Sequence, residues 1–88
     1  MKNRSRDEIL TEILSGLDEP ESRTAIMYKS RLSYAQLQFY HKYLLEKKLI
    51  REEDRRWVST DKGKAFLKAS LAASQILNDD NSNGSTSG

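Results

Sequence analysis

The stretch from Leu32 to Leu67 constrains the fold most, because it places a polar turn and two short apolar runs between two helix-capping signals. Ser33 and Gln36 match a capping box, in which a hydroxyl and an amide side chain satisfy free backbone N–H groups at a helix start. Thr60 precedes a second helical pattern, and Asp61 stands in its first turn, where a carboxylate is favoured by the helix dipole. This order predicts a helix, a β-hairpin and another helix.

Apolar spacing locates these elements within the stretch. Residues 34–48 predict a helix of roughly 22 Å at about 1.5 Å per residue. One face of it carries Leu37, His41, Leu44, Leu45 and Lys48, with Tyr40 at the edge, and the other face carries Ala35, Gln38, Phe39, Lys42, Tyr43 and Glu46. Residues 49–51 and 57–59 predict two short strands. The polar segment 52–56 between them lacks the glycine typical of a tight two-residue hairpin.

Two further helices are predicted before this stretch. Ser5 and Glu8 match another capping box, and apolar residues at helical spacing follow over residues 6–15. Pro20 disfavours helix at the residue before it and therefore indicates a turn. A short helix over residues 23–29 follows, with Ser22 as its cap.

The last part of the chain divides into an apolar stripe and a polar tail. The stripe follows Thr60 and consists of Phe66, Leu67, Ala69, Ala73, Ile76 and Leu77. It is longer than a small domain needs and predicts a homodimer formed through the C-terminal helix. A monomer in which this helix packs across the first helix is the alternative. Residues 78–88 contain no apolar side chain, so we expect one domain over residues 1–77 and a disordered tail over 78–88.

Composition excludes several classes of function. The chain has 88 residues, no cysteine and a single histidine, so neither a disulfide framework nor a metal site is expected, and no cofactor is implied. It contains no glycine-rich phosphate loop, and its carboxylate cluster at residues 18–21 has no neighbouring nucleophile. We therefore expect no enzymatic activity. No apolar run approaches the roughly 20 residues of a membrane span, which favours a cytoplasmic protein.

The net charge of +2 is distributed unevenly. Basic residues precede the predicted central helix and follow the hairpin turn, whereas acidic residues gather at 18–21, 52–54 and 79–80. A segregated basic face suits a polyanion. Since 32% of the residues are charged, a mixed solvated surface would give the same pattern.

From Arg4 to Leu67 the chain resembles archaeal winged helix-turn-helix proteins, a family of predicted transcriptional regulators that includes small dimeric chromatin proteins. The resemblance rests on residues 24–29, 32–37, 44–50 and 60–67. It implies a mainly α fold with a small β-hairpin, and a DNA-binding protein that is a transcriptional regulator or a chromatin-associated factor of the nucleoid. Relatives usually have glycine at Lys48 and a large apolar residue at His41.

Helix-turn-helix geometry then selects candidate contacts to double-stranded DNA, because the second helix of the motif enters the major groove. Ser33 and Tyr34 are candidates for phosphate contacts, Gln36 and Gln38 for adenine, and Lys42 for phosphate or guanine. Phe39 and Tyr43 would meet thymine methyl groups and sugars, or a protein partner. The basic residues Arg31, Arg55 and Arg56 complete the set, the last two as contacts to the minor groove or its flanking phosphates.

Two alternatives stay open at this stage. Each candidate residue is also compatible with an ordinary solvated surface. A winged-helix domain can, moreover, serve as a protein-interaction module without binding DNA, because a fold does not dictate its function.

Overall fold

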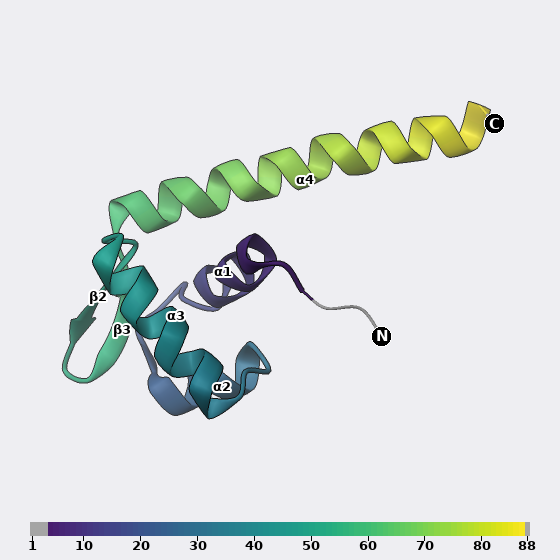
Figure 1. Cartoon of the computed structure of the whole chain (residues 1–88). Coiled ribbons are helices and arrows are strands. Elements are labelled where there is room, and N and C mark those ends of the chain that lie inside the picture. The colour runs from purple at the N-terminus through teal and green to yellow at the C-terminus, as the bar shows by residue number, and fades with distance from the viewer. Residues whose placement is uncertain (1–3, 88) are drawn as a thin grey trace.

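The computed structural model describes residues 4–87, with side chains as far as Leu77. Its elements, in chain order, are α1 (Arg6–Ser15), β1 (Glu21–Ser22), α2 (Arg23–Lys29), α3 (Tyr34–Glu46), β2 (Ile50–Glu53), β3 (Arg56–Ser59) and α4 (Asp61–Ser87) (Figure 1). This is a mainly helical winged helix-turn-helix arrangement with a small antiparallel sheet, which confirms the predicted fold class.

Both predicted capping boxes, Ser5 with Glu8 and Ser33 with Gln36, are present. The Ser5 Oγ accepts from the Glu8 N–H at 3.1 Å, while the Glu8 carboxylate accepts from the Ser5 N–H at 2.7 Å. The Ser22 Oγ accepts from the Ala25 N–H and caps α2. The predicted bounds of α1 and α2 are therefore confirmed, because each start is determined by a side chain three residues away from the amide that it satisfies.

The third helix ends at Glu46, two residues before the predicted end. Lys48 adopts a left-handed conformation with φ of 61°. The Leu49 N–H donates to the Leu44 carbonyl at 2.9 Å and the Lys48 N–H to the Leu45 carbonyl at 3.0 Å, which is a Schellman cap. Lys48 is consequently exposed and does not belong to the apolar face of α3, contrary to the prediction. Glycine adopts this conformation at lower cost, which gives a physical reason for the glycine usual among relatives.

The sheet contains a third strand that the sequence pattern did not predict. Its order is β1-β3-β2, and Trp57 in the central strand pairs with Glu21 of β1 and Glu52 of β2. The hairpin strands are also longer than predicted, so that Glu53 pairs with Arg56. The sequence did not reveal strand β1, because a strand of two residues is too short to show an alternation of apolar and polar side chains.

The hairpin turn is tight, contrary to the expectation of a wider polar turn over residues 52–56. It consists of Asp54 and Arg55 alone, with φ of 50° and 64°. Two consecutive positive φ values characterise the type I′ turn, whose twist matches that of the flanking strands. The strand pairing therefore imposes this turn on residues that are less suited to it than Asn-Gly.

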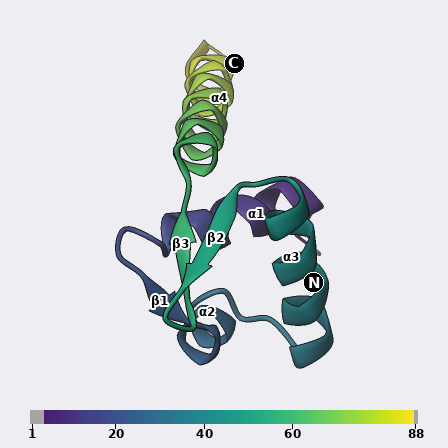
Figure 2. The same ribbon diagram turned by 90° about the vertical axis from the view of Figure 1, so that its left-hand side faces the viewer.

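The core lies between α1, α2, α3 and the inner face of the hairpin (Figure 2). Trp57 is its largest fully buried side chain, and its Nε1 has no hydrogen-bond partner among the described residues. His41, half-buried on α3, stacks on Trp57 with ring centroids 4.7 Å apart. Its Nε2 lies 3.1 Å from the Glu52 carboxylate, close enough for an ion pair but without hydrogen-bond geometry. His41 thus connects α3 to the wing.

The first turn of α4 is locked to the chain that leaves α3. The Thr60 hydroxyl accepts from the Gly63 N–H at 3.0 Å, as the predicted cap requires, and donates to the Lys48 carbonyl at 2.6 Å. The Thr60 N–H donates to the Leu49 carbonyl at 3.1 Å. A Cβ on Gly63 would lie only 2.1 Å from that same carbonyl oxygen, so the contact requires glycine. These bonds determine the direction in which α4 leaves the domain.

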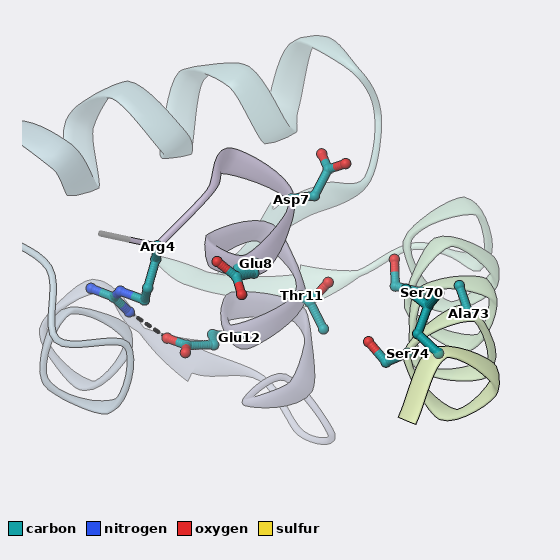
Figure 3. Close-up of a pocket in the computed structure, with 9 residues that line it drawn as sticks. Arg4, Asp7, Glu8, Thr11, Glu12, Ser70, Ala73 and Ser74 are labelled. Carbon is teal, nitrogen blue, oxygen red and sulfur yellow. Dashed lines mark hydrogen bonds and ion pairs between the residues drawn. The ribbon is translucent and has the colours of Figure 1, made fainter. Parts of the chain in front are cut away.

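Helix α4 passes α1 and then continues beyond the rest of the domain (Figure 1). A groove of about 470 Å³ separates the two helices, with Thr11 and Glu12 on one wall and Ser70 and Ser74 on the other (Figure 3). The predicted disordered tail falls at residues 78–88, whose side chains lie outside the described residues. The backbone of α4 nevertheless continues through this segment as far as Ser87, in contrast to the predicted disorder, and the domain boundary at residue 77 remains a prediction.

Two absences concern the described part of the chain. Among residues 4–87, no helix combines the length and apolar character that a membrane crossing requires. The side chains of residues 4–77 bring together no group of three or more potential metal ligands.

The close approach at Gly63 predicts that Gly63→Ala destabilises the protein. Overlap in a tightly packed site costs about 1–3 kcal/mol. Because the Cβ would meet a backbone oxygen at 2.1 Å, we expect the upper part of this range, which exceeds the roughly 1 kcal/mol by which alanine favours a helix. Urea unfolding measures the difference. The control is Gly16→Ala, since a Cβ there meets its nearest atoms at 3.5 Å and φ is −83°. That variant should gain about 0.4–1 kcal/mol. Similar unfolding free energies for the two variants would contradict the close approach of Gly63 to the Leu49 carbonyl.

The hairpin turn predicts opposite effects for the same substitution at adjacent arginines. Arg55→Gly should raise the free energy of unfolding by about 0.5–1 kcal/mol, because glycine adopts positive φ without steric cost. Arg56→Gly should lower it by a similar amount, because Arg56 lies in a regular strand. Both variants lose one charge, so charge alone predicts equal effects. Thermal unfolding distinguishes the two cases.

Candidate nucleic-acid interface

A short turn over residues 30–33 joins α2 to α3. Arg31 has φ of 53°, and its N–H donates to the Tyr28 carbonyl at 3.3 Å. The Leu32 N–H donates to the Met27 carbonyl at 3.0 Å, which completes a second Schellman cap. Ser30 and Leu32 are buried beneath the turn. The angle between α2 and α3 is therefore held by backbone hydrogen bonds and by burial.

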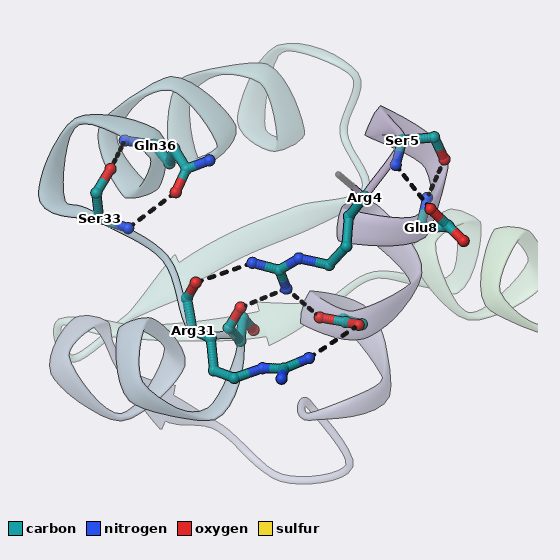
Figure 4. A network of polar contacts seen from close by, with 8 residues as sticks. Arg4, Ser5, Glu8, Arg31, Ser33 and Gln36 are labelled. Carbon is teal, nitrogen blue, oxygen red and sulfur yellow. Dashed lines mark hydrogen bonds and ion pairs between the residues drawn. The ribbon is translucent and has the colours of Figure 1, made fainter. Parts of the chain in front are cut away.

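Arg4 clamps this turn from the N-terminal side (Figure 4). Its guanidinium donates to the Ser30 carbonyl at 2.6 Å and to the Arg31 carbonyl at 2.8 Å, and forms an ion pair with Glu12. Charged donors make stronger hydrogen bonds than neutral ones, so this contact stabilises the motif. The sequence indicated only a basic flank here, since contacts to backbone carbonyls 26 and 27 residues away leave no local pattern. Arg31, by contrast, is exposed and lies 3.8 Å from Glu12.

The N-terminus of α3 carries Ser33, Tyr34 and Gln36. The Ser33 Oγ accepts from the Gln36 N–H at 3.1 Å, and Gln36 Oε1 accepts from the Ser33 N–H at 2.9 Å (Figure 4). Bidentate pairing with adenine uses a glutamine oxygen as well as its NH₂ group. Because the capping box engages Gln36 Oε1, its free hydrogen-bonding group is the NH₂. Tyr34 is 62% exposed beside this cap.

Arg23 of α2 orients two of the candidate residues on α3. Its guanidinium donates to Gln38 Oε1 at 2.9 Å and lies 5.7 Å from the centre of the Tyr34 ring. Arg23 was not among the predicted site residues, because the periodicity of one helix gives no information on contacts between two. Because Arg23 engages the Oε1 of Gln38, the NH₂ group of Gln38 stays available as a donor.

The outer surface of α3 continues with Phe39, Lys42 and Tyr43. Phe39 and Lys42 are exposed, as the helical pattern predicted. Tyr43, expected on the same open face, is instead half-buried, because it lies at the side of α3 that faces α1 and packs against the core. The Arg6 guanidinium lies 5.4 Å from the centre of its ring.

The wing presents Arg55 at its turn and Arg56 at the start of β3, both exposed. None of the ion pairs found among the side chains of residues 4–77 involves either arginine, or Lys42. Arg51 differs, since its guanidinium forms an ion pair with Glu53 at 2.8 Å. Three carboxylates balance the three arginines within residues 51–56, and Asp54 stands beside Arg55 in the turn, so the wing as a whole carries no net charge.

Comparison with known proteins agrees with this architecture. The structure is similar to the crystal structure of Sso10a-2, a DNA-binding protein from Sulfolobus solfataricus, with a TM-score of 0.79 and 23% identity over 94% of this chain and 92% of that one. No curated protein matches the chain in sequence. A family model described as winged helix-turn-helix matches residues 3–77. Since that match spans most of the sequence, the chain belongs to the winged helix-turn-helix family.

Proposed function

We propose that this protein binds double-stranded DNA, with α3 in the major groove and the hairpin tip on the flanking backbone or minor groove. One observation carries the proposal: Lys42, Arg55 and Arg56 are exposed cations without an intramolecular ion pair among the described residues. In a helix-turn-helix the second helix is the element that enters the groove. The similarity in fold to a DNA-binding protein supports the same function.

The candidate residues would fall into two groups, one that contacts phosphates and one that contacts base edges. The Ser33 and Tyr34 hydroxyls, together with Arg31, would hold phosphates at the start of α3, where free backbone amides also attract anions. The NH₂ groups of Gln36 and Gln38 would donate to acceptors on base edges in the major groove. This division describes a binding protein, with no catalytic step.

Both a transcriptional regulator and a chromatin-associated factor would use this interface, and either would be associated with the nucleoid. Sequence preference distinguishes them, because phosphate contacts position a protein without reading bases. A salt-titrated binding series on a candidate site and on random duplex measures that preference directly. Lack of retention on a heparin or DNA column would favour the protein-interaction alternative.

The wing assignment predicts that the double substitution Arg55→Ala and Arg56→Ala weakens binding to all duplexes alike. Each lost phosphate contact should lower the slope of log K against log salt by about 0.9. Fluorescence anisotropy at several salt concentrations measures both effects. The control replaces Lys64 and Lys68, two exposed cations on α4, by alanine and removes the same charge. If the wing variant binds random DNA like the unmodified protein, the assignment is wrong.

We further propose that the protein forms a homodimer through α4. Ile76 and Leu77 are each 62% exposed, although large apolar side chains are more often buried. Ala69 and Ala73 are small enough to let a second helix approach closely. A dimer would place two recognition helices and two wings on one duplex, compensating for the modest net charge of each chain.

The dimer predicts that Ile76→Glu shifts the protein from dimer to monomer, because a carboxylate in an apolar interface remains unpaired and costs several kcal/mol. Analytical ultracentrifugation at micromolar concentration gives the mass. Gln75→Glu is the control, since it adds the same charge one position away on a different face of α4. A monomeric mass for the unmodified protein would reject the dimer.

A further inference from the structure

Phe39 and Tyr43 on the outer surface of α3 form a stack in which Phe39 is exposed and Tyr43 is half-buried. The rings of Phe39 and Tyr43, one turn apart, lie nearly parallel at 17° with centroids separated by 6.3 Å. Tyr40 meets Phe39 edge-on at 5.1 Å, with its own body buried in the core. Phe39 is thus supported by two rings, yet it remains 56% exposed. This arrangement presents a flat apolar surface to solvent in a defined orientation.

Cations surround this stack. The Arg6 guanidinium lies 5.4 Å and the Lys47 ammonium 5.7 Å from the centre of the Tyr43 ring. Lys42 lines a shallow hollow of about 250 Å³ together with Phe39, Tyr43 and Glu46. Three positive charges therefore accompany one carboxylate around an exposed aromatic surface. The groups come from both α1 and α3, which the fold brings side by side here.

We propose that this surface, which we call the aromatic platform (Phe39 and Tyr43 with Arg6, Lys42 and Lys47), binds single-stranded DNA. Unpaired bases would stack on the open face of Phe39, while the three cations contact the backbone phosphates. Stacking on aromatic side chains within a positively charged groove is the general chemistry by which proteins hold single strands.

Two other occupants fit the platform less well. Base faces in a duplex are covered by neighbouring base pairs, so duplex DNA offers Phe39 only groove edges and leaves its ring face without a stacking partner. An apolar protein surface would have to desolvate three cations without providing them with anions, at a high energetic cost. A single strand supplies both an apolar ring face and an adjacent negative charge. This inference goes beyond duplex binding. It shares Lys42 and the outer surface of α3 with the proposed function, but it is carried by Phe39, on which the proposed function does not rest.

The test compares two strands of equal length and charge: a thymidine oligomer and an abasic deoxyribose-phosphate oligomer. The unmodified protein should bind the thymidine strand more tightly, and Phe39→Ala should weaken that binding by about 5- to 150-fold, the contribution of one stacked base. Binding of the abasic strand should not change. Tyr28→Ala is the matched control, because Tyr28 is 74% exposed on α2 and takes no part in the stack.

A second variant reports stacking directly. Phe39→Trp should retain binding of the thymidine strand, and its fluorescence should be quenched on addition of that strand but not of the abasic one. Trp57 is fully buried and supplies a constant background, which the unmodified protein measures. Thermal unfolding of each variant confirms that the domain remains folded.

Three outcomes would overturn the proposal. They are equal affinity of the unmodified protein for the thymidine and abasic strands, equal losses from Phe39→Ala and Tyr28→Ala, and tighter binding of the matching uridine RNA strand. Duplex binding that still depends on Arg55 and Arg56 would show, in each case, that the proposed function stands while the platform does not. If the unmodified protein binds the thymidine strand but no duplex, the proposed function is contradicted and the platform stands.

Discussion

The contact between Gly63 and the Leu49 carbonyl is the constraint on which the arrangement of the domain depends. At this point the end of α3, the start of β2 and the start of α4 meet within one backbone network. The Thr60 hydroxyl joins both sides by donating to Lys48 and accepting from Gly63. A hydroxyl donates one hydrogen bond and still accepts others, so one side chain caps α4 and ties it to α3. Helix α3, the wing and α4 therefore have defined relative positions.

Left-handed backbone at residues other than glycine is concentrated in the turns that shape the candidate interface. Arg31, Lys48, Asp54 and Arg55 all have positive φ, whereas no glycine among residues 4–87 does. Such a conformation costs a side-chain-bearing residue roughly 1 kcal/mol or more. Three of the four side chains are basic, and two of them stand at the helix-turn-helix turn and the wing tip. At these two positions a basic side chain occupies a backbone conformation that glycine would adopt at a lower free-energy cost.

The intramolecular contacts also show why net charge is a poor guide to the interface. Arg4 is engaged with the helix-turn-helix turn, and Arg23 with Gln38. Lys29 forms an ion pair with Glu21 at the edge of the sheet. These cations organise the motif and are not freely available to a polyanion. The number of cations available to a polyanion is consequently smaller than a count of basic residues indicates, and Lys42, Arg55 and Arg56 are among those that remain available.

By itself, the sequence determined the elements whose signals are local. The Ser5, Ser22 and Ser33 caps gave the starts of α1, α2 and α3 correctly, because a capping bond spans only three residues. Helical periodicity likewise identified the exposed position of Phe39. Tertiary structure alone decided strand β1, the tight turn at residues 54–55 and the clamp by Arg4. Strand β1 and the Arg4 clamp depend on partners distant in sequence, which they meet only after the chain has folded. The tight turn depends on the register of β2 on β3, which leaves only Asp54 and Arg55 between the paired residues Glu53 and Arg56.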